Sequence, residues 1–466
     1  MLNTDENTVP INEQQIFDTL KNKVRKDEIY IREVLAKALD LKGLNEQEIA
    51  SLSAVSDPDL LKEMFNTAKK VKEEIYGKRL VLFAPLYVSN LCKNECLYCA
   101  FRRSNKLVRR KALSQEEVRQ EVEALVEQGH KRILLVAGES YPSEGFDYIL
   151  KCIETIYSVK KGRGEIRRVN VNVAPLTLEE FKELKSAKIG TYQLFQETYH
   201  RETYGKVHIG GVKRDFDWRI TAMDRAMEAG IDDVGVGILF GLFDWRFEIL
   251  ALMQHIRHLE KKFGVGPHTI SVPRLEPAVG SELSAHPPYP VSDIDFRKIV
   301  AILRLAVPYT GIIMSTRETP NIRRETFALG VSQISAGSRT NPGGYTGREE
   351  EDMSQFSLGD HRSLDEVIYD ISQLGYIPSF CTACYRLGRT GVDFMDLAKP
   401  GLIKNHCEIN ALTTFVEYLE DYASPPTKEL GWKRIEEILS SMPEGRRNKT
   451  QKLIDRVKSG ERDVFV

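Results

Sequence analysis

The sequence predicts an α/β fold, a (β/α)8 TIM-type barrel with a helical extension before it and a mostly helical domain after it. Three observations predict this organisation. Residues 1–77 carry helical periodicity, residues 78–340 alternate short β-rich runs with amphipathic helices, and residues 341–466 lose that alternation. We therefore expect three units with these boundaries, of which the barrel is the largest.

The N-terminal extension is predicted to be helical because its apolar residues follow helical spacing. Ile16, Leu20 and Val24 recur every four residues, and Asp57-Pro58 is a typical helix start. No residues with catalytic chemistry gather here, so we expect a supporting cap.

The barrel is predicted from eight β-rich runs with helix starts between them. Ser114 with Glu117 and Thr177 with Glu180 have the spacing of capping boxes, and Ser292 is a further N-cap. Doubly wound sheets share this alternation, so it does not by itself establish closure. We expect the strands at residues 79–88, 132–138, 166–174, 191–197, 233–240, 269–275, 311–316 and 332–337, and two closing helices near 407–422 and 427–440.

Composition excludes several classes of protein. The formal net charge is −1, so no basic excess points to nucleic acid as a partner. No apolar run has the length of a membrane span, and the first residues are acidic rather than basic and apolar. We expect a cytoplasmic protein that binds neither membrane nor nucleic acid.

The seven cysteines are distributed as in a metalloprotein. Six of them fall into two groups of three, and Cys152 stands alone in a helical pattern, where we expect a core residue. Clustered cysteines in a cytosolic enzyme indicate metal or redox sites before disulfides. The groups are Cys92/Cys96/Cys99 and Cys381/Cys384/Cys407.

The first group, Cys92, Cys96 and Cys99, directly follows the first predicted strand. Three thiolates on one loop can bind a 4Fe–4S cluster and leave one iron without a protein ligand. A structural zinc site needs four ligands, and no fourth Cys or His lies nearby in sequence. The spacing therefore favours an iron–sulfur cluster.

With this motif, residues 79–340 resemble the radical S-adenosylmethionine (SAM) superfamily. The resemblance implies that SAM binds the open iron and is cleaved reductively to a 5′-deoxyadenosyl radical. It also implies cofactor-binding roles at the carboxyl ends of the strands, where barrel active sites form. These residues are Tyr98 beside the adenine, Gly138 and Glu139 at the methionine amino group, Glu197 at the ribose or methionine, Arg219 at the carboxylate, and Gly237, Gly241 and Pro273.

The run Ser271–Pro277 on the sixth predicted strand resembles the aromatic-amino-acid lyases of this superfamily, which include the tyrosine lyase of thiamine synthesis. A substrate carboxylate favours a bidentate arginine, so Arg323 is our candidate clamp. The same mouth of the barrel is expected to contain Ser315, Arg317 and Ser338.

The second group, Cys381, Cys384 and Cys407, resembles the C-terminal extension of the tyrosine lyases of FeFe-hydrogenase maturation. That resemblance implies cleavage of L-tyrosine to p-cresol and dehydroglycine, followed by formation of carbon monoxide and cyanide. Both would bind an extra iron, carrying a cysteine, at an auxiliary iron–sulfur cluster. The resemblance also implies two kinds of partner. One is an electron donor such as a ferredoxin or flavodoxin, and the other is a set of downstream maturation proteins.

His268 precedes the sixth predicted strand, so it should lie at the barrel face opposite the first cluster. If the C-terminal domain closes that face, His268 is a candidate ligand of the extra iron, with His406 as a rival. Diatomic products would then need an internal passage through or beside the barrel. Three alternatives remain: a thiamine-pathway lyase that stops at dehydroglycine, an iron–sulfur carrier, and a sulfur-inserting enzyme of the biotin-synthase kind.

Overall fold

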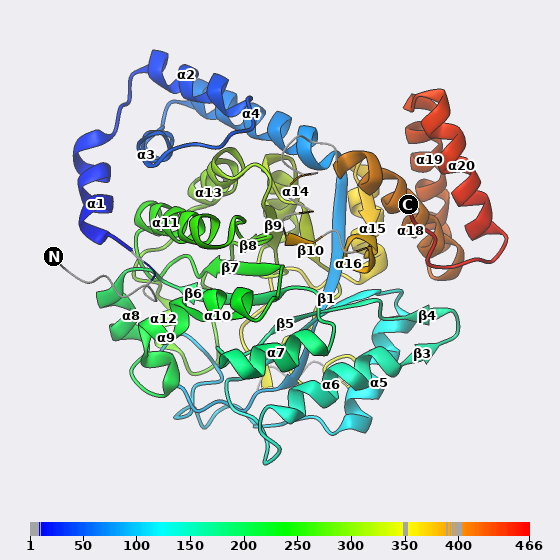
Figure 1. The fold of residues 1–466 in the computed structure, drawn as a ribbon, viewed down its shortest axis with the longest axis horizontal. Helices are drawn as coiled ribbons and strands as arrows, with labels where there is room; N and C mark the ends of the chain where they lie inside the picture. The colour runs from blue at the N-terminus through cyan, green and yellow to red at the C-terminus, as the bar shows by residue number, and fades with distance from the viewer. Residues whose placement is uncertain are drawn as a thin grey trace.

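The computed structural model describes residues 9, 11–347, 353–387, 390–391, 393, 396 and 403–466 (Figure 1). The N-terminal extension is helical, as predicted, and packs on the outside of the barrel. Asp57 caps its longest helix, and Pro58 occupies the first turn, where a missing N–H costs nothing. Its elements are α1 (Glu13–Asp18), the π-helical turn η1 (Thr19–Lys23), α2 (Glu28–Ala38), α3 (Glu46–Ser53) and α4 (Pro58–Tyr76).

Eight parallel strands form a closed barrel, which confirms the predicted fold and excludes an open doubly wound sheet. Each strand pairs with its neighbours in chain order, and the last pairs with the first through Val81–Gln333 and Phe83–Ser335. All eight runs predicted from the sequence are strands. They are β1 (Arg79–Ser89), β2 (Arg132–Ala137), β5 (Arg168–Asn172), β6 (Tyr192–Glu197), β7 (Val234–Ile238), β8 (Thr269–Ser271), β9 (Gly311–Met314) and β10 (Gln333–Ser335).

Helices surround the barrel and begin at the predicted caps. Ser114 and Thr177 each form a complete capping box, and Ser292 accepts a hydrogen bond from the backbone of Asp295. A small antiparallel pair, β3 (Lys160–Lys161) and β4 (Gly164–Glu165), precedes β5. The helices are α5 (Gln115–Glu127), α6 (Asp147–Ser158), α7 (Leu178–Ser186), α8 (Arg201–Val207), η2 (Val212–Arg214), α9 (Phe216–Ile220), α10 (Ala222–Glu228), α11 (Trp245–Phe263), α12 (Glu282–Ala285), α13 (Asp293–Ala306) and α14 (Pro320–Leu329).

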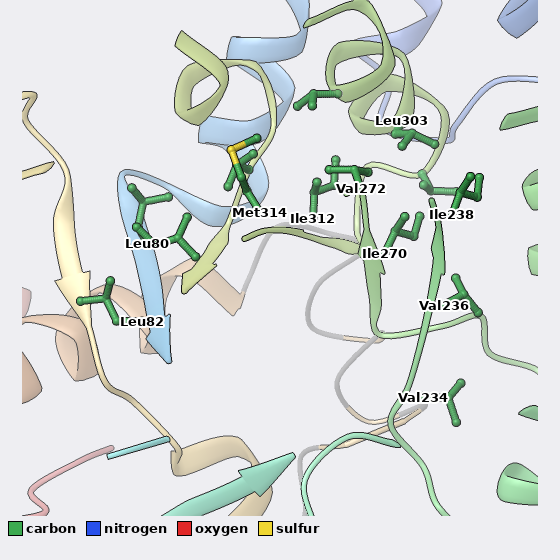
Figure 2. Packing of buried hydrophobic residues seen from close by; sticks show 14 of the residues in the cluster. Leu80, Leu82, Val234, Val236, Ile238, Ile270, Val272, Leu303, Ile312 and Met314 are labelled. Atoms are coloured by element: carbon green, nitrogen blue, oxygen red, sulfur yellow. The ribbon is translucent and has the colours of Figure 1, made fainter. Parts of the chain in front are cut away.

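Alternate residues of each strand face opposite sides of the barrel wall. Figure 2 shows one set, which belongs to the main hydrophobic core: side chains of β1, β7, β8 and β9 together with Leu303 of α13. In β7 this set is Val234, Val236 and Ile238, so Gly235 and Gly237 face the interior. The interior positions therefore remain available to line cavities rather than the helix-packed core.

The C-terminal domain joins the barrel through an additional strand. β11 (Ile377–Ser379) pairs in parallel with Arg79–Val81 at the amino end of β1. Neither this strand nor the last helix was predicted from the sequence. The remaining elements are α15 (Leu364–Gln373), α16 (Ala383–Arg386), α18 (Ile403–Asp421), α19 (Pro425–Ser441) and α20 (Glu444–Lys458).

Because β11 pairs at the amino end of β1, this domain lies across the amino-terminal face of the barrel (Figure 1). Two of its helices, α18 and α19, correspond to the closing helices expected from the sequence. In the described part of the chain, no helix is both long and apolar enough to cross a membrane.

Candidate active site and auxiliary cysteine site

The barrel has a cavity at each end. The cavity at the carboxyl ends of the strands, here called the upper cavity, has an empty volume of about 1360 Å³, which includes the open solvent at its mouth. On β1 it is lined by Phe83, Pro85 and Tyr87. The cavity at the amino ends, here called the lower cavity, has an empty volume of about 560 Å³ and is lined on β1 by Arg79 and Val81.

Cys92, Cys96 and Cys99 all line the upper cavity, on the loop that follows β1. Burial raises the pKa of all three thiols, that of Cys92 to about 11, and the negative charge of Glu139 adds to the effect at Cys92. Such thiols become ligands only when a positive metal centre stabilises their thiolates. Three cysteines facing one cavity fit an iron–sulfur cluster.

This arrangement differs from a mononuclear metal site. Among the described residues, no three His, Cys, Asp or Glu side chains are grouped so that they could hold one metal ion. An iron–sulfur cluster does not require three side chains around one metal ion, because each cysteine binds a different iron.

Beside the cysteines, four charges form one network, in which Glu197, Lys213 and Arg219 are buried and Glu139 is partly buried. Lys213 Nζ lies 2.6 Å from Glu197 Oε1, and Arg219 Nη1 lies 2.9 Å from Glu139 Oε1. Asn94 donates to Glu139 at 2.6 Å. Two acids and two bases in a water-poor cavity provide fixed partners for the charged amino, carboxylate and sulfonium groups of a ligand such as SAM.

Three members of this network, Glu139, Glu197 and Arg219, were predicted from the sequence, but Lys213 was not. Lys213 lies in a short turn, η2, outside any motif. Its partner Glu197 has a φ of +74°, in the left-handed region that side chains other than glycine rarely adopt. The strand register shifts between Phe195 and Glu197, so this strained strand end directs the carboxylate into the cavity.

Tyr98 lines the cavity, and its hydroxyl group is 2.8 Å from His208 Nε2. Burial lowers the pKa of His208 well below its usual value, so the imidazole is neutral. Tyr98 packs with an apolar group that includes Leu239 and Leu275, a surface suited to a heteroaromatic ring.

The predicted glycines have different roles. Gly138 lines the cavity, and a Cβ there would lie 2.2 Å from the carbonyl oxygen of Leu91. Pro273 also lines it. Gly237 and Gly241 do not, although a Cβ at Gly237 would lie 2.5 Å from the ring of Phe195, which is a cavity residue. Gly237 therefore shapes the cavity by making room for that ring.

The predicted substrate residues divide into two pairs. Ser315 and Arg317 line the upper cavity, whereas Arg323 and Ser338 do not. Arg323 is fully buried, pairs with Asp360 and donates to the carbonyl oxygen of Ser335 at 2.6 Å. The expectation that Arg323 clamps the substrate is therefore corrected, because its guanidinium group is already paired inside the protein.

Two arginines line the cavity, and Arg317 is the one that is not paired with a carboxylate there. Among the described residues its guanidinium group forms no ion pair, and it lies 3.3 Å from the centroid of the Phe356 ring. Glu276 lines the same cavity, and burial, reinforced by Glu318, raises its pKa to about 7. An arginine and a carboxyl group in one cavity match the two charged groups of an α-amino acid.

The lower cavity contains the second cysteine group. Cys381 follows β11, Cys384 lies on α16, Cys407 lies on α18, and His268 precedes β8. The structure therefore brings together the four residues that the sequence analysis assigned to the auxiliary site, on the barrel face opposite the first group. His406 does not line this cavity.

The lower cavity is more basic than the upper one. Arg79 and Arg132 line it together with a single acid, Asp233, and Arg132 donates to the carbonyl oxygen of Cys381 at 2.8 Å. Burial lowers the pKa of His268, although Asp233 Oδ1 lies 3.7 Å from its Nδ1. The neutral imidazole is the form that binds metals. Three thiols, a neutral histidine and two cations fit a cluster whose bound thiolates carry negative charge.

The two cavities approach each other along the barrel axis. On β1, Val81 lines the lower cavity and Phe83 lines the upper cavity. On β10, Gln333 lines the lower cavity and Ser335 lines the upper cavity. Residues two apart on a strand are consecutive inward positions. One layer of side chains therefore separates the cavities, and the internal passage expected from the sequence stays a prediction.

Comparisons with known proteins agree with this geometry. Residues 86–255 match the Radical SAM superfamily, and residues 271–377 match the Biotin and Thiamin Synthesis associated domain. A 2-iminoacetate synthase of Salmonella typhimurium is 33% identical over 346 residues, which are 73% of this chain and 88% of that protein.

Two solved structures resemble the chain over nearly its whole length. One is the crystal structure of HydG, a maturase of the FeFe-hydrogenase, with 52% identity and a TM-score of 0.94 over 98% of this chain and 99% of that one. The other, HydG from Carboxydothermus hydrogenoformans, has 45% identity and a TM-score of 0.83 over 95% and 97%. The chain therefore belongs to the radical SAM superfamily and, within it, to the HydG maturase family.

Proposed function

We propose that the chain cleaves L-tyrosine at the Cα–Cβ bond to p-cresol and dehydroglycine, and then converts dehydroglycine to carbon monoxide and cyanide. Both products are assembled on an auxiliary-cluster iron, which carries a cysteine, as a precursor of the FeFe-hydrogenase cofactor. The observation that carries the proposal is a cysteine-lined cavity at each end of one barrel.

In the upper cavity, Cys92, Cys96 and Cys99 hold a 4Fe–4S cluster with one open iron. When bound there, the cluster and SAM supply a 5′-deoxyadenosyl radical. The charges Glu139, Glu197, Lys213 and Arg219 orient the cofactor, because each is already held by its neighbours.

The substrate is held by the cavity's own charges. Arg317 binds the tyrosine carboxylate as a bidentate cation, and Glu276 faces the ammonium group. Ser315 lines the cavity two residues before Arg317 and is available as a hydrogen-bond donor. Holding both ends of the amino acid fixes the aromatic ring relative to the reacting centre.

In the lower cavity, Cys381, Cys384 and Cys407 hold the auxiliary cluster, and His268 binds the extra iron. Carbon monoxide and cyanide reach that iron through the barrel. An electron carrier such as a ferredoxin or flavodoxin serves the first cluster, and maturation proteins accept the product. We place the reaction in the cytoplasm, where thiols remain reduced.

The test separates the two cavities. Cys384→Ser weakens the auxiliary cluster, so we expect p-cresol to persist in an anaerobic assay while carbon monoxide falls sharply. Cys152→Ser, a buried cysteine outside both cavities, is the matched control and should retain both products. Loss of p-cresol in a folded Cys384→Ser protein with an intact first cluster would contradict the division of labour.

The similarity to 2-iminoacetate synthase favours one second candidate, an enzyme that stops at dehydroglycine. The same assay decides between them. That candidate forms p-cresol but no carbon monoxide in the parent protein, so Cys384→Ser would leave its products unchanged.

A further inference from the structure

A groove on the side of the C-terminal domain adjoins the lower cavity. We call it the side groove; its empty volume is about 1120 Å³. Its walls come from the end of α4 and the start of β1, from the segment around β11, and from α18, α19 and α20. The lining residues are Glu73, Tyr76, Gly77, Lys78, Arg79, Gly375, Ile377, Glu408, Arg434, Glu437, Ile438, Ser441 and Arg446.

The side groove and the lower cavity share two residues. Tyr76 and Arg79 line both, so the two spaces adjoin at these side chains. At the other end of the groove, Lys78, Glu437 and Ser441 are exposed to solvent. The groove therefore runs from the surface to the wall of the auxiliary site.

The groove is lined by four basic and three acidic side chains, and Arg79 is the cation that it shares with the lower cavity. On its outer walls, Glu408 pairs with Arg446 at 2.6 Å and Glu437 with Arg434 at 2.5 Å, so these charges compensate each other. At the inner end, Arg79 forms no ion pair with a carboxylate among the described residues, and its Nε is buried without a hydrogen-bond partner.

Arg79 and Tyr76 also form a unit at this inner end. The Arg79 guanidinium carbon lies 5.5 Å from the centroid of the Tyr76 ring, and the Tyr76 hydroxyl donates to the carbonyl oxygen of Tyr309. The tyrosine is therefore anchored, and the arginine presents a cation to both cavities.

In our proposal, the route along the barrel axis carries the diatomic products made in the upper cavity. One layer of inward side chains separates the upper cavity from the lower, and the upper cavity is where SAM and tyrosine bind in our proposal. Ligands that reach the auxiliary site from solution, rather than from the upper cavity, need another way.

We infer that the side groove is a second access route to the auxiliary site, through which small anionic ligands enter and leave past Arg79 and Tyr76. The inference rests on the proposed function, because it requires an auxiliary cluster at Cys381, Cys384 and Cys407. It adds a binding role for Arg79, which attracts the anion at the inner end of the groove.

Ser441 and Ser440 offer a matched pair of substitutions. Both are exposed at the end of α19, but only Ser441 lines the groove. Ser441→Trp should fill the groove, and Ser440→Trp should place the same ring outside it. The probe is potassium cyanide, added to reconstituted, dithionite-reduced protein with SAM bound at the first cluster and no tyrosine present. Its association with the auxiliary iron is followed by freeze-quench electron paramagnetic resonance.

We expect Ser441→Trp to slow cyanide association several-fold and Ser440→Trp to match the parent. Arg79→Gln should also slow association, whereas Lys78→Gln, its exposed neighbour, should have little effect. Equal rates in the two tryptophan variants, with the auxiliary signal present, would overturn the inference alone. Absence of the auxiliary signal from the parent protein would overturn the proposed function and the inference together.

Discussion

The upper and lower cavities are built from one barrel in different ways. The upper cysteines lie within eight residues on one loop, and the charges beside them come from the barrel strands and their loops. The lower cysteines come from a separate domain, on three segments that meet His268 because the domain docks on the barrel, in part through the pairing of β11 with β1. The upper site is therefore local to the barrel, whereas the lower site depends on domain docking.

Docking of that domain relies on a buried carboxylate as well as on β11. Glu417 of α18 accepts a hydrogen bond from Arg167 at 3.0 Å and lies 3.5 Å from Lys131. All three side chains are buried, and both bases stand at the amino ends of barrel strands. The contrast between a local site and a docked site leads to predictions with different outcomes for the two.

The largest expected effect is on the upper site. Cys96→Ala removes one of three cluster ligands, so reductive cleavage of SAM should be abolished. Cys152→Ala removes a thiol from the core instead and should leave cleavage intact. The measurement is 5′-deoxyadenosine formed with a strong reductant. Substantial product from Cys96→Ala would refute the cluster assignment.

A smaller and selective effect is expected when docking is weakened. Glu417→Gln leaves Arg167 and Lys131 buried beside a neutral side chain, and breaking such a pair typically costs roughly 3–5 kcal/mol. We expect loss of auxiliary-cluster iron with p-cresol formation retained.

The control for docking is Glu420→Gln on the same helix, whose pair with Lys428 at 3.3 Å is exposed. Exposed pairs contribute at most about 1 kcal/mol, so both clusters should persist. If p-cresol disappeared together with the auxiliary iron in Glu417→Gln, the upper site would not be independent of docking.

The next effect concerns substrate affinity in the upper cavity. Arg317→Lys keeps a positive charge but loses the bidentate geometry, so the KM for tyrosine should rise roughly tenfold. Arg323→Lys disturbs the buried pair with Asp360 and should lower thermal stability without changing that KM. Reversed results would restore Arg323 as the substrate clamp.

The barrel strands could be predicted because the pattern of each one lies within a single short segment. Two elements near the C-terminus, β11 and α20, could not be predicted in this way. Every barrel strand is a short run that contains β-branched or aromatic residues, and the capping boxes mark helices between them. β11 has three residues with Pro378 at its centre, so pairing with β1 rather than propensity makes it a strand. α20 carries few apolar residues, so the spacing of its apolar residues does not indicate a helix clearly.

The residues of the candidate site show the same difference: some could be predicted from local sequence patterns, and others are brought to the site only by tertiary contacts. The cysteine groups could be read from spacing alone, and Glu139, Glu197 and Arg219 from a family resemblance. Arg317 and Arg323 both follow β9, and only the tertiary contact with Asp360, far along the chain, separates their roles. Lys213 was missed for the same reason, since only the fold brings it to Glu197.

The smallest expected effect concerns the layer between the two cavities. Val81 is the inward residue of β1 on the lower side of that layer, next to Phe83 on the upper side. Val81→Phe adds volume where diatomic products would pass, while Val81→Ala removes it. p-Cresol formation, which depends on the upper cavity alone, should be unchanged in both variants. In Val81→Phe, the share of carbon monoxide captured on iron should fall and the share released to solution should rise.

Two measurements give that ratio. Infrared spectroscopy measures iron-bound carbon monoxide, and trapping by a haem protein measures the free gas. The same ratio in both variants would mean that the products take another path, beside the barrel rather than through it.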